Sequence, residues 1–184
     1  LALLVLICIP LQLFGSLTLS QKVGQLLMVY FHGDEANEDA KALIHEIGVG
    51  GIIYYTWANE LSSYTQVKNL SEGLQKLALN SSTALPLLIA IDQEGGRVTR
   101  LKNGFTPMQD NRTIASFENP LLAKQQAMVT GSELYDVGIN INFAPVVDIC
   151  RGGVIGDRSY GNTPEIVIDF ARQSIEGYRL AGIR

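Results

Sequence analysis

Residues 87–101 of the chain read LLIAIDQEGGRVTRL, an apolar run that changes abruptly into carboxylates, glycines and arginines. An unbroken apolar run of this length predicts a strand that is covered on both faces, as in a parallel sheet. Ligands of such sheets bind beyond the carboxyl ends of the strands, which is where Asp92 stands. The two glycines permit a tight turn, and Arg97 and Arg100 would lie side by side if a helical turn follows. This loop therefore offers fixed charges of both signs to a polyhydroxylated ligand.

Strands and helices alternate on both sides of this stretch. We predict further strands over residues 26–31, 50–55 and 141–147, and helices over residues 38–47, 61–79, 119–135 and 163–180, after a short first helix capped by Ser20. Residues 102–118 have no strong period and are predicted to form a surface loop. The alternation, without hairpin signals, predicts parallel βα units. From the pattern alone, a doubly wound sheet and a (β/α)8 barrel both remain open.

The composition is that of one globular domain. Of the 184 residues, 47% are hydrophobic and 17% are charged, which excludes a disordered chain. The net charge of −4 leaves no basic surface of the kind that binds nucleic acids, so no nucleic-acid partner is expected. No group of Cys or His residues has the spacing of metal ligands, and we predict no metal and no cofactor.

The first residues, LALLVLICIPLQLF at positions 1–14, are almost wholly apolar. We interpret residues 1–16 as the hydrophobic region of a secretory signal peptide, or a remnant of one, because a membrane span needs about 20 residues. A buried helix or strand of the domain is the alternative, but Pro10 interrupts the run and no amphipathic period is visible. We therefore expect a secreted, periplasmic or cell-envelope protein without a stable membrane span.

Two blocks of the sequence resemble the signatures of a known enzyme family. IDQEGGRVTRL at residues 91–101 is similar to one signature of the glycoside hydrolase family 3 β-N-acetylhexosaminidases. NFAPVVDI at residues 142–149, followed by VIGDRSYG at residues 154–161, resembles the next signature in order. The resemblance runs from about Leu19 to the last residue and implies a (β/α)8 barrel. Since a complete barrel needs about 250 residues, residues 17–184 are expected to form its N-terminal half, with about the first four βα units.

The resemblance assigns three residues to a sugar-binding subsite. It implies that Asp92 holds sugar hydroxyls in the −1 subsite, that Arg100 contacts the same sugar, and that Arg158 reaches into the subsite. The residues alone leave Asp92 a structural alternative, in which it caps its turn by accepting N–H bonds from residues 94–96. Its position at the end of a buried strand favours the ligand-binding interpretation.

Four further charged residues are predicted to support these three. Arg97 is expected to orient Glu94 or Asp92 through a bidentate pair. Asp157 is expected to be the partner that fixes its own glycine-rich loop. Asp148, at the end of the fourth predicted strand, would either touch ligand or anchor backbone amides.

Two ring-bearing residues follow the first and second predicted strands. Trp57 could stack on a sugar ring, but the family has no fixed tryptophan here, and we prefer packing against the neighbouring loop. His32 has no identifiable carboxylate partner and is predicted to be solvated, without a role in the site.

The resemblance implies a retaining glycosidase. We predict that the intact protein is a β-N-acetylhexosaminidase that removes terminal non-reducing N-acetylglucosamine from peptidoglycan fragments or chitin oligosaccharides by double displacement. In this family the nucleophile is an Asp and the proton carrier is a His, both expected beyond Arg184, so no catalytic residue is assigned within the chain. A β-glucosidase or β-xylosidase of the same family and an inactive sugar-binding protein are the alternatives.

A chain with part of the barrel is expected to behave differently from the whole. Its first and fourth strands would have unpaired edges, and its apolar interior would be half covered. We therefore predict that the isolated polypeptide self-associates and lacks hydrolase activity.

Overall fold

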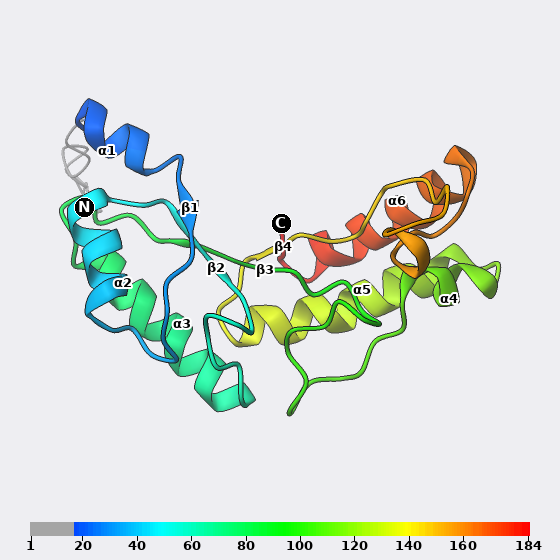
Figure 1. The fold of residues 1–184 in the computed structure, drawn as a ribbon, viewed down its shortest axis with the longest axis horizontal. Coiled ribbons are helices and arrows are strands. Elements are labelled where there is room, and N and C mark those ends of the chain that lie inside the picture. Colours follow the sequence, from blue (N-terminus) through cyan, green and yellow to red (C-terminus); the bar gives the residue numbers. More distant parts are fainter. Residues whose placement is uncertain (1–16) are drawn as a thin grey trace, which may run out of the picture.

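The computed structural model describes residues 17–184, in which four strands and their helices alternate along the chain (Figure 1). The predicted signal-peptide region, residues 1–16, lies outside the described residues. The strands are β1 (Met28–Val29), β2 (Gly51–Tyr54), β3 (Leu88–Ile91) and β4 (Ile141–Asn142). The helices are α1 (Leu19–Gly24), α2 (Glu38–Ala42), which continues into a π-helical turn (Leu43–Ile47), α3 (Tyr64–Leu79), α4 (Asn111–Ser116), α5 (Pro120–Asp136) and α6 (Pro164–Leu180), with a 3-10 turn at Gly156–Arg158.

The four strands form one parallel sheet in the order β1-β2-β3-β4, so each strand pairs with its neighbour in the sequence. In this register Gly51 lies opposite Leu88, and Ala90 lies opposite Ile141. A doubly wound sheet reverses its strand order at a switch point, whereas a barrel adds its strands in sequence. The predicted incomplete (β/α)8 barrel is therefore confirmed.

The last residue of the chain pairs with the edge of β4. The amide of Arg184 donates to the carbonyl of Asn140 at 3.1 Å, and the amide of Asn142 donates to the carbonyl of Arg184 at 3.0 Å. These two bonds follow the pattern of a parallel ladder, so Arg184 takes the place of a fifth strand. The prediction that the fourth strand has an unpaired edge is wrong at this position, because the chain itself covers it. Among the described strands, none pairs with the outer edge of β1.

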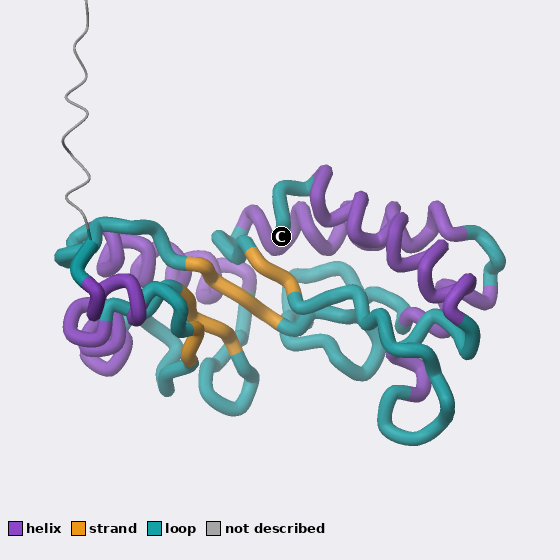
Figure 2. The backbone as a smooth tube through the Cα atoms, turned by 90° about the horizontal axis from the view of Figure 1, so that it is seen from above, coloured by secondary structure: helices purple, strands orange, loops and turns teal. Residues whose placement is uncertain are grey.

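Helices flank the sheet in two groups. Figure 2 shows the strands between one group formed by α1, α2 and α3 and another formed by α4, α5 and α6. The loops that follow the strands gather on the same side of the sheet, and they carry the charged residues of the two sequence blocks. None of the helices in the described part of the chain is long and apolar enough to cross a membrane.

Two buried apolar clusters hold these layers together. The first lies between the sheet and its helices, and its fully buried side chains include Ile52, Ile89, Ile91, Leu70 and Leu74. The second joins α4, α5 and α6 to the loop after β4, where the rings of Tyr160 and Phe170 stack with centroids 5.4 Å apart. Burial raises the pKa of Tyr160 to about 12, so its hydroxyl stays protonated at neutral pH. This second cluster fixes the glycine-rich loop to α6.

Two local predictions are corrected. The first helix is capped by Thr18 and not by Ser20, because the Thr18 hydroxyl accepts from the amide of Gln21 while the Gln21 side chain accepts from the amide of Thr18. Residues 102–118 are not all loop, since α4 forms within them. Its cap is Asp110, whose carboxylate accepts from the amide of Thr113 at 2.8 Å.

The two long helices α5 and α6 cross closely at Gly177. A Cβ atom at this position would lie 2.4 Å from the carbonyl oxygen of Lys124 and 2.8 Å from the Cβ atom of Ala127. We expect Gly177→Ala to lower the free energy of unfolding by about 1–2 kcal/mol, because the helices must move apart. Ile175→Ala, at an exposed position of the same helix, should change it by no more than about 0.5 kcal/mol. Urea denaturation measures both changes, and an unaltered Gly177→Ala protein would contradict the close crossing.

Candidate functional site

The loop that follows β3 turns back at Gly95 and Gly96. Both glycines have a left-handed backbone, with φ angles of 95° and 55°, and an antiparallel bridge joins Gly95 to Val98. Val98 pairs back with Gly95 in this bridge, so residues 97–100 leave the turn without forming a helix. The helical turn that was predicted to place Arg97 and Arg100 side by side does not form, and the two arginines contact different partners.

Asp92 lies directly after β3 and pairs with Arg100. The Nη2 atom of Arg100 donates to the Oδ2 atom of Asp92 at 3.2 Å, and both side chains are partly exposed. The alternative in which Asp92 caps its turn is not observed, because the amides of Glu94 and Gly96 donate to backbone carbonyls instead. The buried Nε atom of Arg100 has no hydrogen-bond partner among the described residues, so Arg100 keeps donor capacity beside Asp92.

Two buried amide side chains hold this pair in place. The Oε1 atom of Gln93 accepts from the amides of Arg100 and Leu101 at 2.8 and 3.1 Å. Asn142, at the end of β4, accepts from the amide of Gln93 and donates to its carbonyl, both at 2.9 Å. Gln93 and Asn142 were not among the residues predicted for the site, although an amide side chain at the end of an apolar strand is a signal that could have identified them. Together they fix the backbone of the Asp92 loop to β4.

Glu94 and Arg158 form the shortest ion pair among the described residues, and its carboxylate is the most buried. The Nε and Nη2 atoms of Arg158 each donate to a carboxylate oxygen of Glu94 at 2.7 Å. The Glu94 side chain is only 6% exposed and that of Arg158 is 29% exposed, so water screens the pair weakly. Its hydrogen bond to Glu94 raises the pKa of Arg158 further above its ordinary value. This bidentate pair joins the loop after β3 to the loop after β4.

Arg97 has a different partner from the one predicted. It was expected to orient Glu94 or Asp92, but its Nε atom pairs with the Oδ1 atom of Asp157 at 2.8 Å. Its Nη2 atom also donates to the carbonyls of Val154 and Ile155. After the turn at the two glycines, Arg97 faces the loop that follows β4, and its ion pair with Asp157 connects that loop to the loop after β3.

Asp148 does not stand at the tip of a strand, because β4 already ends at Asn142. Its side chain is exposed, and its carboxylate accepts no hydrogen bond from the described residues, so the predicted anchoring of backbone amides is not observed. The anchor at this point is the buried Ser159, whose hydroxyl donates to the carbonyl of Asp148 at 2.6 Å. The negative charge of Asp148 contributes to the raised pKa of Arg158, which places it near the ion pair.

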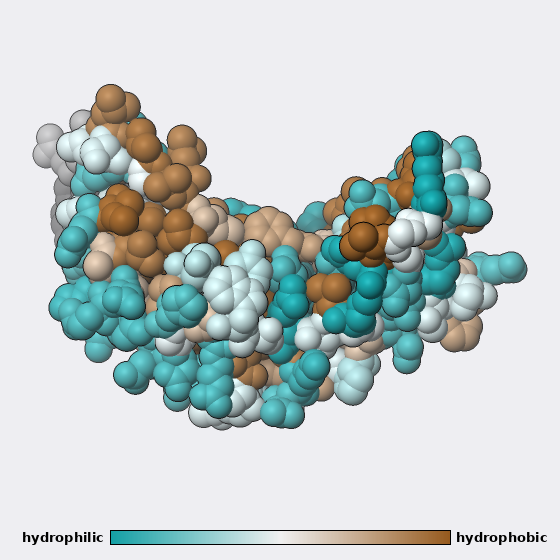
Figure 3. All heavy atoms as spheres, viewed as in Figure 1, coloured by the Kyte–Doolittle hydropathy of each residue, from teal (hydrophilic) through white to brown (hydrophobic). Residues whose placement is uncertain are grey.

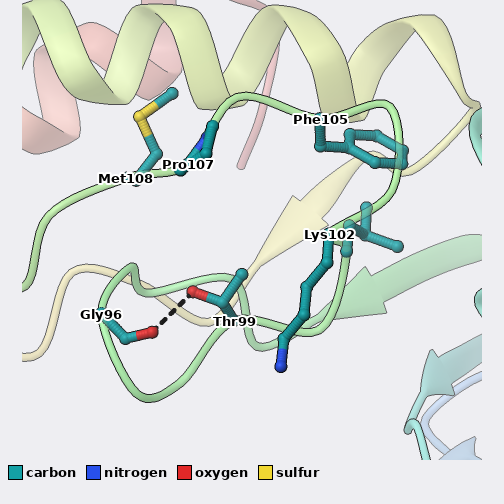
Figure 4. Close-up of a pocket in the computed structure, with 7 residues that line it drawn as sticks. Gly96, Thr99, Lys102, Phe105, Pro107 and Met108 are labelled. Carbon is teal, nitrogen blue, oxygen red and sulfur yellow. Dashed lines mark hydrogen bonds between the residues drawn. The ribbon is translucent and has the colours of Figure 1, made fainter.

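A cavity of about 300 Å³ lies on another side of the loop after β3, lined by Gly96, Thr99, Leu101, Lys102, Phe105, Pro107 and Met108. Figure 4 shows this cavity beside the turn, where the hydroxyl of Thr99 donates to the carbonyl of Gly96 at 2.9 Å. None of Asp92, Arg100 and Arg158 lines it. These three residues, with Glu94, form a charged group on the loops that follow β3 and β4.

The site can bind a neutral, hydroxyl-rich molecule. Asp92 and Asp148 supply acceptors, while Arg100 and Arg158 supply donors in fixed positions. Glu94 is buried and both of its carboxylate oxygens are held by Arg158, so it supports the site from behind, whereas Asp92 is partly exposed beside Arg100. Within residues 17–184, no group of three His, Cys, Asp or Glu residues could hold a metal ion. The arrangement offers hydrogen-bond donors and acceptors in fixed positions, which is what binding and orienting such a molecule requires.

Comparison with known proteins gives a consistent result. The family model described as the glycosyl hydrolase family 3 N terminal domain matches residues 18–184. A beta-hexosaminidase of Photobacterium profundum is 35% identical over 161 residues, which are 85% of this chain and 46% of that protein. Beta-hexosaminidase A of Pseudoalteromonas piscicida is 33% identical, and the match covers 91% of this chain and 31% of that protein. The chain thus spans less than half the length of these relatives.

Solved structures agree with this match. A glycoside hydrolase family 3 beta-N-acetylglucosaminidase from Paenibacillus superposes with a TM-score of 0.87 at 47% sequence identity, covering 91% of this chain and 32% of that one. The beta-N-acetylhexosaminidase of Beutenbergia cavernae superposes with a TM-score of 0.82 at 28% identity, covering 91% of this chain and 52% of that one. Sequence identity and structural similarity therefore indicate the same family.

Proposed function

Since the chain belongs to glycosyl hydrolase family 3, we propose that the whole protein is a β-N-acetylhexosaminidase that removes terminal non-reducing N-acetylglucosamine. Relatives and structural neighbours with this activity in their names support the proposal. Peptidoglycan fragments and chitin oligosaccharides are the proposed substrates. The reaction would be a double displacement that retains the anomeric configuration.

The observation that carries the proposal is the charged group at the ends of β3 and β4. Asp92 would accept hydrogen bonds from sugar hydroxyls, and Arg100 beside it would donate hydrogen bonds to their oxygens. Arg158 is held rigidly by Glu94, so it can contact the sugar without losing further conformational freedom. These residues position the anomeric carbon, which is a contribution of orientation and charge.

A direct test compares two chromogenic substrates with the whole protein. We expect hydrolysis of 4-nitrophenyl N-acetyl-β-D-glucosaminide and much slower hydrolysis of 4-nitrophenyl β-D-glucoside, with the first product released as the β-anomer in an NMR time course. Hydrolysis of the glucoside alone would instead assign a β-glucosidase. Binding of N-acetylglucosamine without turnover of either substrate would assign an inactive sugar-binding protein.

The isolated chain is proposed to lack this activity and to self-associate. Apolar side chains at and after α1 are exposed, including Leu19, Val23, Leu26 and Leu27. Figure 3 shows such side chains gathered over α1 and β1, beside the hollow between the two limbs of the molecule. Exposed apolar patches of this kind favour association. Light scattering and the same chromogenic assay test the proposal, and a monodisperse monomer with turnover would contradict it.

The apolar segment at residues 1–16 is proposed to direct the protein to the cell envelope or beyond it. We expect the protein in the periplasm, cell envelope or culture medium, and N-terminal sequencing to place the mature start near residue 17. Recovery from the cytosol with residues 1–16 intact would contradict the proposal.

A further inference from the structure

Four rings gather where β1 and β2 end, outside the charged group. Tyr30 and His32 follow β1, and Tyr55 and Trp57 follow β2. Trp57 is central, because it stacks on Tyr55 with ring centroids 5.1 Å apart and meets the edge of Tyr30 at 4.7 Å. The ring of His32 lies 5.9 Å from that of Trp57. We call these four residues the aromatic platform.

The buried side chain of Asn59 supports the aromatic platform by connecting its two loops. Asn59 is almost completely buried, and its Nδ2 atom donates to the carbonyls of Phe31 and Gly33 at 3.2 and 2.8 Å. Its Oδ1 atom accepts from the amide of Tyr55 at 3.2 Å. One side chain therefore ties the exit loop of β1 to the exit loop of β2. A polar residue buried with all these bonds satisfied fixes the relative positions of the two loops.

Within residues 17–184, the aromatic platform is open at its surface. Trp57 is 60% exposed and Tyr30 is 45% exposed, although each has ring neighbours. Aromatic rings that are held rigidly and still exposed mark binding surfaces, because they offer apolar area at a low cost in conformational entropy. The rings follow the carboxyl ends of β1 and β2, which are the same ends that carry Asp92 on β3. The platform therefore shares the functional side of the barrel.

The two loops that carry the aromatic platform are acidic, which favours a neutral ligand over an anionic one. Its two loops, residues 30–37 and 55–62, contain Asp34, Glu35 and Glu60 but no Lys or Arg. All three carboxylate side chains are exposed. An anionic ligand would be repelled there, whereas a pyranose ring offers an apolar face to the rings and hydroxyls to the carboxylates.

We infer that the aromatic platform is an outer subsite that binds a second pyranose ring of a neutral β-linked N-acetylglucosamine oligosaccharide. The identity of the sugar rests on the proposed function, while the platform itself rests on the ring geometry and on Asn59. A subsite of this kind favours chitin oligosaccharides over peptidoglycan fragments, because muramyl sugars bear a carboxylate either on a free lactyl group or on the peptide stem that is attached to it.

Kinetics of Trp57 variants of the whole protein test this subsite. We expect Trp57→Ala to lower kcat/KM for chitotetraose about tenfold more than kcat/KM for the chromogenic monosaccharide, which corresponds to about 1.4 kcal/mol of stacking. Trp57→Phe, which keeps a ring, should recover part of the loss. Tyr135→Ala is the matched control, because Tyr135 is 63% exposed but lies at the end of α5 that leads into the start of β4. Equal losses on both substrates, or none, would overturn the inference.

Binding gives a readout that does not need catalysis. Trp57 is the only tryptophan among the 184 residues, so the fluorescence change that Trp57→Phe abolishes reports on the platform. We expect a saturable change with chitotetraose and a weaker one with a peptidoglycan tetrasaccharide of equal length. If the protein hydrolyses neither substrate but shows this change, the proposed function fails and the subsite stands. If it hydrolyses N-acetylglucosaminides and shows no change, the function stands and the subsite fails.

Discussion

Replacing Arg158 with alanine is expected to lower the free energy of unfolding by about 3 kcal/mol and to remove measurable hydrolysis by the whole protein. The stability loss follows because Glu94, only 6% exposed, would keep a buried carboxylate without its partner. The activity loss follows because Arg158 also supplies a donor to the site. Urea denaturation measures the first effect, and hydrolysis of the chromogenic N-acetylglucosaminide measures the second.

Two controls distinguish the effect of breaking the buried ion pair from the effect of losing one positive charge. Arg179→Ala removes a similar bidentate pair with Glu176, but this pair is exposed on α6, and we expect little change in stability. Replacing both Arg158 and Glu94 with leucine should recover much of the stability, because no unpaired charge remains, while activity stays lost. A single Arg158→Ala protein as stable as Arg179→Ala would show that water, and not Arg158, satisfies Glu94.

Asp92→Asn is expected to lower kcat/KM of the whole protein by about 10²-fold. The variant keeps the size of the side chain but loses the charge that strengthens its hydrogen bonds to sugar hydroxyls, each worth about 1.5–3 kcal/mol. Its stability should change little, because Asp92 and Arg100 are both partly exposed and their pair contributes at most about 1 kcal/mol.

The matched control is Asp169→Asn, an exposed carboxylate on α6 outside the charged group. It should leave kcat/KM and stability unchanged. If Asp92→Asn also hydrolysed the chromogenic N-acetylglucosaminide at the normal rate, Asp92 would have no role in holding the sugar. Assignment of the −1 subsite to the end of β3 would then be wrong.

The order of the elements was predictable, but their extents were not. Apolar runs bounded by glycine and polar residues located β2 and β3 closely, because those strands are buried and paired on both sides. The predicted strand over 141–147 shrinks to β4, since Pro145 has no amide to donate and the side chains of Phe143 and Val147 are exposed. The helix α4 was missed because six residues are too few to show a period, although Asp110 carried a capping signal.

The two sequence blocks that carry the charged residues of the candidate site were recognisable, but the pairing of those residues was not predictable. The sequence contains three arginines and several carboxylates within two blocks, and the resemblance selected Asp92, Arg100 and Arg158 among them. Which arginine meets which carboxylate depends on the left-handed turn at Gly95 and Gly96, whose direction no local pattern specifies. Arg97 therefore pairs with Asp157, and Arg158 takes the Glu94 carboxylate that Arg97 had been expected to meet.

The order of the strands has a consequence for how the polypeptide matures on the ribosome. Each of β2, β3 and β4, and Arg184 after β4, finds backbone partners on the strand made just before it. The described part of the sheet can therefore grow one strand at a time as synthesis proceeds. The Glu94–Arg158 pair joins residues that are 64 positions apart, so it can close only after β4 and the loop that follows it have been made.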